Sequence, residues 1–301
     1  MITFSIVITT YNRLSDLEIT LKSLEHLFQR DDVELLVLDD DSIDGTQQFL
    51  KNNYHSHRLF FNTKRKGLIY NRNVLNNHAK GDYIISVDDD AHFLTKNILE
   101  EIQKCFNEYS DCAVQSLRIF WGANQPKTFR TKDKIKLTKG FVGCGHVWRK
   151  TAWNTITNYP AWFVFYGEEE FASYQLFKSN WKIYYNPNVL VHHRVDVKLR
   201  KEQKDYQIRL RRSLRSGWYL YVLFYPLNQI PKRFLYTVYT QIKRKTFKGD
   251  IKASIAIIQA LFDVLLNLPR LIKISNRLTQ VEFKAYQKLP ETKLYWKPEQ
   301  D

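Results

Sequence analysis

The first two thirds of the chain alternate short apolar runs with segments of helical periodicity, and this alternation limits the possible folds more than any other feature. Between the runs, apolar residues such as Leu17, Leu21 and Leu24 recur at the spacing of one helix face. Strands that alternate with helices predict an α/β fold with a mostly parallel sheet flanked by helices. The runs are rich in β-branched residues and occupy positions 2–10, 33–38, 58–62 and 83–87.

Residues at the ends of these segments predict where each one starts and stops. Ser15 is placed to cap the first helix, and the second helix is expected to start at Thr46. The third helix is predicted over residues 67–81, between two glycines. A further strand is predicted over residues 181–185. Asn186-Pro187 is expected to end it, because proline lacks the N–H that a sheet ladder needs.

Polar clusters follow three of the predicted strands. They span residues 9–13, 39–41 and 88–90. In a parallel sheet the carboxyl ends of the strands meet at one edge, where nucleotides and other ligands bind. Three adjacent aspartates at 88–90 repel one another unless a cation is bound, and carboxylates are suitable ligands for Mg²⁺ or Mn²⁺. The alternative is a solvated acidic turn without a ligand.

The composition is that of a folded protein from a reducing compartment. Hydrophobic residues make up 44% and aromatic residues 15% of the 301 positions, which supports a packed core. Cys105, Cys112 and Cys144 have no CxxC spacing, so neither a disulfide framework nor a zinc site is predicted. The N-terminus lacks the basic segment of a signal peptide. We therefore expect a cytoplasmic protein.

The net charge of +15 is concentrated in the last third of the chain. Residues 1–193 hold 23 basic and 22 acidic side chains, whereas residues 194–301 hold 23 and 9. The first region is almost neutral, and the second is strongly basic. This asymmetry predicts a neutral catalytic domain followed by a basic region that faces an anionic partner.

Six motifs, in this order, resemble those of family 2 glycosyltransferases with the GT-A fold. They are SIVITTYNR, LDDDSIDGT, KGLIYNRN, SVDDDA, GEEEF and the pair His192-His193. The resemblance covers residues 1–195 and implies a Rossmann-like GT-A domain, with residues 196–301 as a helical, basic region. Asp41 stands where the family commonly has glycine, but aspartate tolerates a left-handed backbone. Asn71 replaces a commoner alanine, and neither departure removes a catalytic group.

The resemblance implies a site for a nucleotide-diphosphate sugar, with UDP- or dTDP-sugars as the expected donors. Asp39 would accept a hydrogen bond from the base, and Arg72 would lie near the sugar or the diphosphate unless it is a surface cation. Asp88 would lie near the ribose or the donor sugar, while Asp89 could point back toward the protein. The donor-binding set implied in this way is Thr9, Tyr11, Arg13, Asp39, Asp41, Gly67, Arg72, Asp88 and Asp89.

The resemblance also implies a divalent cation, Mn²⁺ or Mg²⁺, that bridges the donor phosphates. Asp90 is the expected ligand together with Asp88, and which carboxylate contacts the ion stays open. A histidine after the last strand would add a contact. His193 is favoured by its distance from Pro187, and His192 is the alternative. The cation would stabilise the negative charge that develops on the leaving diphosphate.

The second acidic cluster, Glu168–Glu170, precedes a predicted amphipathic helix. Its simplest role is to stabilise the helix N-terminus. By resemblance, Glu169 is the general base that deprotonates the acceptor hydroxyl, Glu168 binds or orients a neighbouring group, and Glu170 is the alternative base. One base opposite the leaving group implies inversion at the anomeric carbon. The loop expected beside the donor sugar and the acceptor, for which a plain turn is the alternative, contains Gly143, Gly145 and His146.

The C-terminal region combines basic and apolar segments. Cations are dense over residues 198–215, and the aromatic segment 218–227, suited to a membrane–water interface, is too short to span a membrane. Residues 253–268 are apolar except for a polar stripe that includes Asp263, which argues against a spanning helix. A helix packed in a small subdomain is one interpretation, and a helix on a membrane surface is the other. We expect peripheral docking on the anionic inner face of the cell membrane.

Together these features predict a metal-dependent, inverting glycosyltransferase that transfers sugar to a glycan or lipid-linked glycan in surface polysaccharide synthesis. A transferase that acts on a protein is an alternative. A non-catalytic nucleotide- or nucleic-acid-binding protein is another, but the sequence has no RNP1 or zinc-knuckle signature, and its acidic clusters would repel a phosphate backbone. We therefore expect no nucleic-acid partner. Asp88, Asp90 and Glu169 together argue against a sugar-binding relative without activity.

Overall fold

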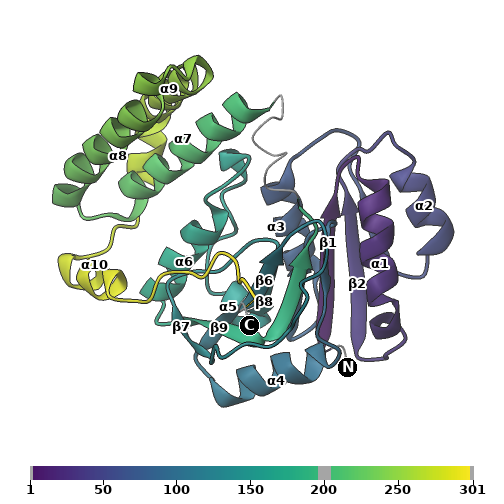
Figure 1. Cartoon of the computed structure of the whole chain (residues 1–301). Helices are drawn as coiled ribbons and strands as arrows, with labels where there is room; N and C mark the ends of the chain where they lie inside the picture. Colours follow the sequence, from purple (N-terminus) through teal and green to yellow (C-terminus); the bar gives the residue numbers. More distant parts are fainter. Residues whose placement is uncertain (1–2, 196–204, 299–301) are drawn as a thin grey trace.

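The computed structural model describes residues 3–195 and 205–298 of the chain. A nine-stranded mixed sheet forms its centre, and helices cover both faces (Figure 1). The strand order is β3-β2-β1-β4-β8-β6-β9-β5, and β7 pairs with β9. The strands are β1 (Phe4–Thr10), β2 (Val33–Asp39), β3 (Arg58–Phe61), β4 (Tyr83–Val87), β5 (Ala91–Phe93), β6 (Cys112–Trp121), β7 (Lys136–Thr138), β8 (Gly145–Arg149) and β9 (Lys182–His193).

The first half of the sheet is parallel, and the second half is mixed. β3, β2, β1 and β4 all run in the same direction. β8 is antiparallel to both β4 and β6, and β6 is parallel to β9. The predicted α/β sheet is thus confirmed. Its parallel half brings the carboxyl ends of β1, β2 and β4 to one edge, where the three polar clusters follow.

Helices on the two faces bury separate sets of strand side chains. In β1, Ile6 and Ile8 face one core, and Val7 faces the other, as the alternation along a strand requires. Figure 1 shows α1 and α2 on the right of β1 and β2, and α3 on their left. The helices on the Ile6 side are α1 (Leu14–Phe28), α2 (Thr46–Asn53) and α4 (Ile98–Glu108); those on the Val7 side are α3 (Leu68–His78), α5 (Lys150–Trp153) and α6 (Glu168–Lys178).

The first helix begins at Leu14, so Ser15 is not its cap as predicted. The backbone N–H of Leu14 donates to Asp44 Oδ2 at 2.9 Å. A carboxylate from a distant loop therefore satisfies one of the free N–H groups at this helix end. The same carboxyl group also accepts from the Thr46 N–H and hydroxyl, so Asp44 organises the starts of α1 and α2 together.

The prediction that Asn186-Pro187 ends a strand is wrong. β9 continues through both residues to His193. Its register against β6 shifts where Asn186 pairs with Leu117 and Leu190 pairs with Arg118. This irregularity lets the strand pass proline without breaking the sheet.

The helical region predicted at the C-terminus is present. Its aromatic segment does not face outward, however: Trp218 and Tyr219 are 2% and 1% exposed because α7 packs between α9 and the rest of the protein. The cations Lys198, Arg200, Lys201 and Lys204 lie outside the described residues. The helices of this region are α7 (Tyr206–Phe224), α8 (Ile230–Arg244), α9 (Ile251–Lys273) and α10 (Gln280–Gln287).

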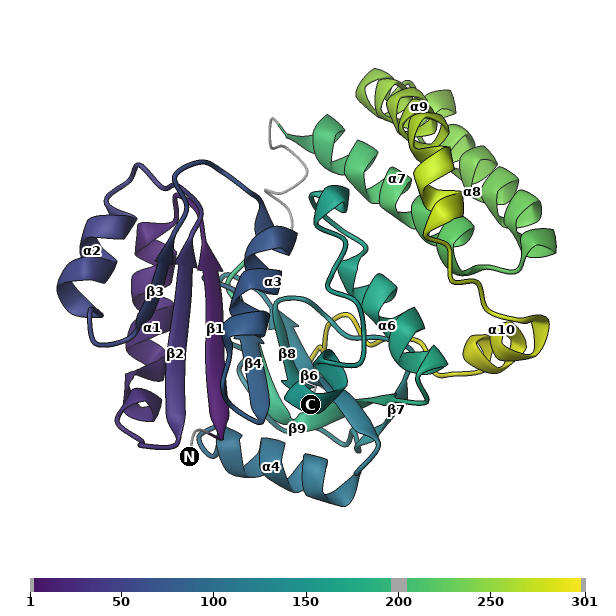
Figure 2. The ribbon, with the colours of Figure 1, turned by 180° about the vertical axis from the view of Figure 1, so that it is seen from behind.

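The C-terminal segment returns to the sheet after α10 (Figure 2). The Tyr286 ring lies 4.6 Å from the ring of Tyr174 in α6, centroid to centroid. The backbone N–H of Trp296 donates to the carbonyl of Ile119 at the end of β6. The helical region and the α/β region therefore share one continuous core.

Candidate functional site

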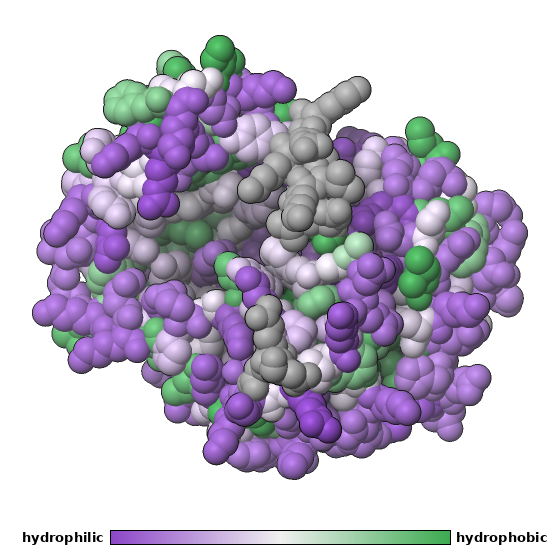
Figure 3. All heavy atoms as spheres, viewed as in Figure 1, coloured by the Kyte–Doolittle hydropathy of each residue, from purple (hydrophilic) through white to green (hydrophobic). Residues whose placement is uncertain are grey.

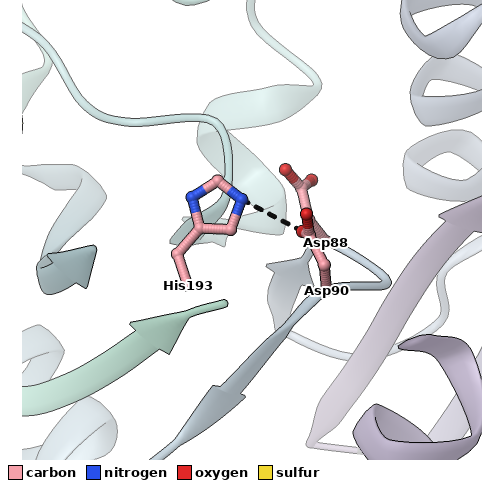
Figure 4. Close-up of side chains that lie close together, drawn as sticks. All are labelled: Asp88, Asp90 and His193. Carbon is pink, nitrogen blue, oxygen red and sulfur yellow. Dashed lines mark ion pairs between the residues drawn. The ribbon is translucent and has the colours of Figure 1, made fainter. Parts of the chain in front are cut away.

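The aspartate triplet occupies a short turn between β4 and β5. β4 ends at Val87, and the Ala91 N–H donates to the Asp88 carbonyl at 3.0 Å. Because β5 then pairs antiparallel with β9, Ala91 lies opposite His193. His193 Nε2 is consequently 3.0 Å from Asp90 Oδ1, and both side chains are buried (Figure 4).

Asp88, Asp90 and His193 form a cluster suited to a divalent cation. Each of the three offers one ligand atom, and these atoms lie within 4.8 Å of one another. Two carboxylate oxygens and one imidazole nitrogen form a donor set that suits Mn²⁺. Of the two predicted histidines, His193 lies in this cluster. His192 instead makes a 2.7 Å hydrogen bond between its Nε2 and the Gly122 carbonyl.

Asp89 differs from the aspartates on either side of it. Its carboxylate turns back into the protein and accepts a 2.8 Å hydrogen bond from the Thr10 hydroxyl. Burial raises the pKa of Asp89 to about 7, although Arg13 opposes this rise. Burial also disfavours the charged form of Asp90, but a hydrogen bond and the charge from His193, together with Arg13, lower its pKa to about 2.

Two arginines brace the triplet. Arg13 Nη2 lies 2.9 Å from Asp90 Oδ2, and Arg13 Nε lies 3.5 Å from Asp89 Oδ1. Arg194 donates to the Asp89 carbonyl, and its Nη2 is 2.9 Å from the Thr20 hydroxyl. Arg13, which the resemblance predicts to bind the donor nucleotide, therefore also offsets the negative charge of the carboxylates around the candidate metal position.

Arg72 joins the aspartate cluster to the glutamate cluster. Its Nη2 donates to Asp88 Oδ1 at 2.7 Å and to the Gly143 carbonyl at 2.9 Å. Its Nη1 donates to Glu168 Oε1 at 3.0 Å. The side chain is 5% exposed, so Arg72 is not the surface cation that the sequence left as an alternative. A buried guanidinium between two carboxylates fixes the distance between the two clusters.

The three glutamates have three different environments. Glu168 is buried against Arg72, Glu169 has a side chain that is 21% exposed, and Glu170 is exposed. Glu169 Oε1 lies 3.9 Å from Arg72 Nη1. Burial and the charges of Glu168 and Glu170 raise the pKa of Glu169 well above its usual range, and Arg72 only partly offsets the rise. The pKa of the exposed Glu170 is raised as well. Glu169 is thus the member that combines partial exposure and a raised pKa with a position beside Arg72.

The glycine loop before β8 packs directly against this arginine and glutamate. A Cβ atom at Gly143 would lie 2.2 Å from Glu169 Oε1 and 2.9 Å from Arg72 Nη1. A Cβ atom at Gly145 would meet two core side chains at 3.0 Å. His146 is fully buried, and its neutral form is held by burial and by Arg72, which lower its pKa to about 3. The role that the resemblance gives to His146, beside the donor sugar and the acceptor, stays a prediction.

Comparison with known proteins decides the family. Residues 5–166, more than half of the chain, match the family model described as glycosyl transferase family 2. The chain belongs to glycosyl transferase family 2. A search of the curated proteins found no match.

Solved structures with low sequence identity share the GT-A-like fold of this glycosyltransferase. GalNAc-T7 with UDP, GalNAc and Mn²⁺ has a TM-score of 0.61 and 13% identity, covering 90% of this chain and 58% of the GalNAc-T7 chain. Mannosyltransferase PcManGT from Pyrobaculum calidifontis, with GDP-Man and Mn²⁺, has a TM-score of 0.56 and 15% identity over 94% and 78% of the two chains. S. aureus TarS 1–349 in complex with UDP-GlcNAc has a TM-score of 0.56 and 18% identity over 91% and 84%. The transferase thus spans less than two thirds of the GalNAc-T7 chain.

The transferase carries a second group of polar side chains at the ends of β1 and β2. Asp39 accepts hydrogen bonds from the Ser42 N–H and the Gln47 side chain, at 3.0 and 2.9 Å, through Oδ2. Its other oxygen, Oδ1, has no hydrogen-bond partner among the described residues. Thr9 is the last but one residue of β1, and the Tyr11 ring packs under a guanidinium, 4.1 Å from its centroid.

The turn after β2 keeps the geometry that glycine would provide. Asp41 has φ +68°, which is the left-handed backbone expected for this position. Asp40 accepts from the Lys66 and Gly67 N–H groups at 2.8 Å, and Gly67 itself has φ +92°. The loop before α3 is therefore held against the end of β2.

Three residues of the site escaped the sequence analysis. Arg194 was counted with the basic C-terminal region, yet it holds the aspartate turn. Asp40 was not singled out within its acidic run, although it anchors the loop before α3. Arg65, which covers Tyr11, stood in a run of three cations with no distinguishing mark. Position next to the His192-His193 motif was the only sequence signal for Arg194.

Proposed function

We propose that this family 2 glycosyltransferase is metal-dependent and inverting. In this proposal it moves a sugar from a UDP- or dTDP-sugar to a hydroxyl group of a glycan or lipid-linked glycan. One observation carries the proposal. A single buried arginine, Arg72, connects Asp88 of the Asp88–Asp90–His193 cluster with the Glu168–Glu169 pair. A donor site and a base are thereby held at a constant separation.

Asp88, Asp90 and His193 would hold Mn²⁺ or Mg²⁺. The bound ion would supply charge stabilisation to the leaving diphosphate. The similar structures of GalNAc-T7 and PcManGT contain Mn²⁺, which supports this assignment. Arg13, already in contact with Asp90, adds a second positive charge beside the phosphate position.

The base of the donor would bind between β1 and β2. The free Oδ1 of Asp39 is an acceptor for the N3–H of uracil or thymine. Tyr11 and Arg65 form a stacked pair beside it that presents a flat surface to a planar base. The UDP and UDP-GlcNAc in structures of TarS support a uridine nucleotide, whereas PcManGT contains GDP-Man.

Glu169 would remove the proton of the acceptor hydroxyl as it attacks the anomeric carbon. Its partial exposure gives an acceptor access, and its raised pKa strengthens it as a base near neutral pH. Glu168 accepts a hydrogen bond from Arg72. It would therefore orient Arg72 rather than accept a proton from the acceptor. Attack from the side opposite the leaving diphosphate gives inversion.

The acceptor would be a growing surface polysaccharide or a lipid-linked glycan at the inner face of the cell membrane. The strong positive charge after residue 193 supports a location beside anionic lipids. In this view the protein is cytoplasmic and peripheral to the membrane.

Binding of nucleotides with and without Mn²⁺ tests the proposal. We expect UDP or dTDP to bind the transferase tightly in the presence of Mn²⁺ and weakly after chelation, as measured by calorimetry. A panel of nucleotide sugars, assayed for metal-dependent hydrolysis, then identifies the donor. Equal binding of every nucleotide with and without metal would refute the assignment of the Asp88–Asp90–His193 cluster.

A further inference from the structure

Helix α9 is apolar on both its inner and its outer side: Ala256, Ile257, Ala260 and Val264 are buried, yet large hydrophobic side chains are also exposed. Its outward side chains are large and hydrophobic, and they recur every three or four residues along one side of the helix. We name this set the α9 outer face: Ile251, Ile255, Ile258, Phe262, Leu265 and Leu266, which are 41–79% exposed. A helix of a soluble domain normally carries polar and charged side chains on the side that points away from the core.

The polar stripe that the sequence showed on α9 packs against α7. Arg211 on α7 makes two hydrogen bonds to Asp263, at 2.6 and 2.7 Å. Asn267 donates to the Tyr219 hydroxyl at 2.9 Å. These contacts fix the rotation of α9 about its own axis. The outward direction of the apolar stripe is therefore set by specific hydrogen bonds.

Helix α8 extends the exposed apolar surface. Leu235, Tyr236 and Tyr239 are 57–66% exposed, and Phe247, between α8 and α9, is 76% exposed. Figure 3 shows hydrophobic groups at the upper left of the molecule, over α8 and α9, among hydrophilic side chains. Tyrosines beside aliphatic residues are typical of a protein surface at the boundary between lipid and water.

The charges around this surface have a single sign. Residues 227–273, all described by the structure, contain nine lysines and arginines and only Asp250 and Asp263 as acids. Asp263 is paired with Arg211. Asp250 accepts from the Ala253 N–H, which caps α9, and from the Tyr206 hydroxyl. The exposed charges beside the apolar groups, such as Lys252 and Lys273, are therefore positive.

A membrane-spanning helix and a contact between two copies of the chain both fit this apolar face less well. By length and composition α9 could cross a membrane, with a mean hydropathy of 1.7 over its most apolar window. Crossing would break the ion pair between Arg211 and Asp263 or carry the arginines of α7 into lipid. A second copy of the chain would bring two strongly positive surfaces together, which charge repulsion opposes.

We infer that the α9 outer face and the adjoining side of α8 bind the surface of an anionic lipid bilayer. The apolar side chains enter the interface, and the flanking cations contact the headgroups. This inference extends the proposed function by naming the surface that docks, but it does not depend on the transfer reaction.

Helix α7 connects the proposed docking surface to the loop that precedes the proposed base. Helix α7, which carries α9, packs against the loop before α6. The Ser216 hydroxyl donates to the Phe165 carbonyl, and a Cβ atom at Gly167 would lie 3.0 Å from Ser216 Cβ. Gly167 directly precedes Glu168 and Glu169. A bilayer bound to α9 would thus be held at a constant distance from the proposed base.

Vesicle flotation of the full chain tests the inference without any donor or acceptor. We expect the protein to float with vesicles of equal parts phosphatidylglycerol and phosphatidylcholine, and to float less at high salt. The double variant Phe262→Ser/Leu266→Ser should bind more than about tenfold more weakly, since two exposed apolar side chains are lost. Val281→Ser is the matched control, because Val281 is 78% exposed but lies on α10; it should bind like the unaltered chain.

Three outcomes would overturn the inference. The first is no flotation, and the second is equal flotation of the unaltered chain and the double variant. The third is a dimer in light scattering that the double variant dissociates, without vesicle binding, which would assign the surface to a second copy. Circular dichroism and melting confirm that each variant is folded. Because no step of the assay uses the nucleotide site, failure of the docking inference is distinguishable from failure of the proposed transfer reaction.

Discussion

The two acidic triplets of this glycosyltransferase have equal formal charge and different geometry. After β4, the three aspartates lie in a tight turn, and Asp89 points away from its two neighbours. Asp88 and Asp90 therefore lie with His193, and Asp89 turns back to Thr10. In the first turn of α6, each residue is rotated by about 100° from the one before. The glutamates consequently pass from buried, through partly exposed, to exposed along Glu168–Glu170.

This difference shows how the local backbone conformation gives identical neighbouring residues different contacts. The tight turn after β4 brings Asp88 and Asp90 to one position, which suits a shared cation. The helical period separates the acids, so that one member pairs with Arg72 and the next is available to a substrate. Arg72 then couples the two triplets through Asp88 and Glu168.

The largest effect is expected from Glu169→Gln. Removal of the base should lower the transfer rate by about 10³-fold, within the range known for general bases, while nucleotide binding is retained. Glu170→Gln is the matched control, because Glu170 is exposed and should change the rate less than about threefold. Initial rates and calorimetry measure both quantities. A larger loss in Glu170→Gln would move the base one residue along the helix.

Asp90→Asn is expected to weaken metal-dependent binding of the nucleotide by at least about 100-fold, because it removes a ligand of the cluster. Asp89→Asn should change this affinity less than about threefold, since the asparagine can still accept the hydrogen bond from Thr10. Titration of UDP with Mn²⁺ measures both variants. Similar losses in the two variants would mean that Asp89 and Asp90 do not have the separate roles that their contacts indicate.

Gly143→Ala should lower the transfer rate by about 100-fold, because the new methyl group would displace Glu169 and a small misplacement of a catalytic group has an effect of this size. Gly217→Ala is the control: apart from its chain neighbours and the backbone of its own helix, no heavy atom of the described residues lies within 4 Å of a Cβ atom at this position. It should leave the rate unchanged. A fully active Gly143→Ala variant would show that the loop yields without disturbing the glutamate.

The smallest effect concerns the pH profile. A general base acts when deprotonated, and the pKa of Glu169 is raised by burial and by Glu168 and Glu170. The transfer rate should therefore fall as pH decreases through a value above the usual glutamate range. Replacing Glu170 by Gln removes one of the neighbouring charges and should move this acidic limb to lower pH. Rates measured across pH in both proteins test this shift, and an unmoved limb would assign the titration to another group.

Local patterns were sufficient to predict the α/β order, the family and the motifs whose residues lie together in the candidate site. The strand runs, the helical spacing and the positions of the acidic clusters are properties of neighbouring residues. Such properties can be recognised without knowing which distant residues are in contact. Asp41 shows the same principle, because its left-handed backbone could be anticipated from its place in the turn. The family model over residues 5–166 agrees with these motifs.

Contacts between distant residues were decided by the tertiary structure. His193 rather than His192 meets Asp90 because β5 pairs with β9 in one particular register, across a separation of about a hundred residues in the chain. Arg194 holds the aspartate turn for the same reason. The pattern of polar and apolar residues along a strand does not determine which strand it will pair with.

Helix α9 shows what the sequence alone could not decide. The sequence by itself determined that α9 is apolar with one polar stripe. Only the tertiary structure decided that the stripe faces inward, because Arg211 and Tyr219 of α7 provide its hydrogen-bond partners. A buried polar group needs such a partner, whereas an apolar group can be left exposed or covered by another surface. The direction in which the helix faces is therefore set by α7.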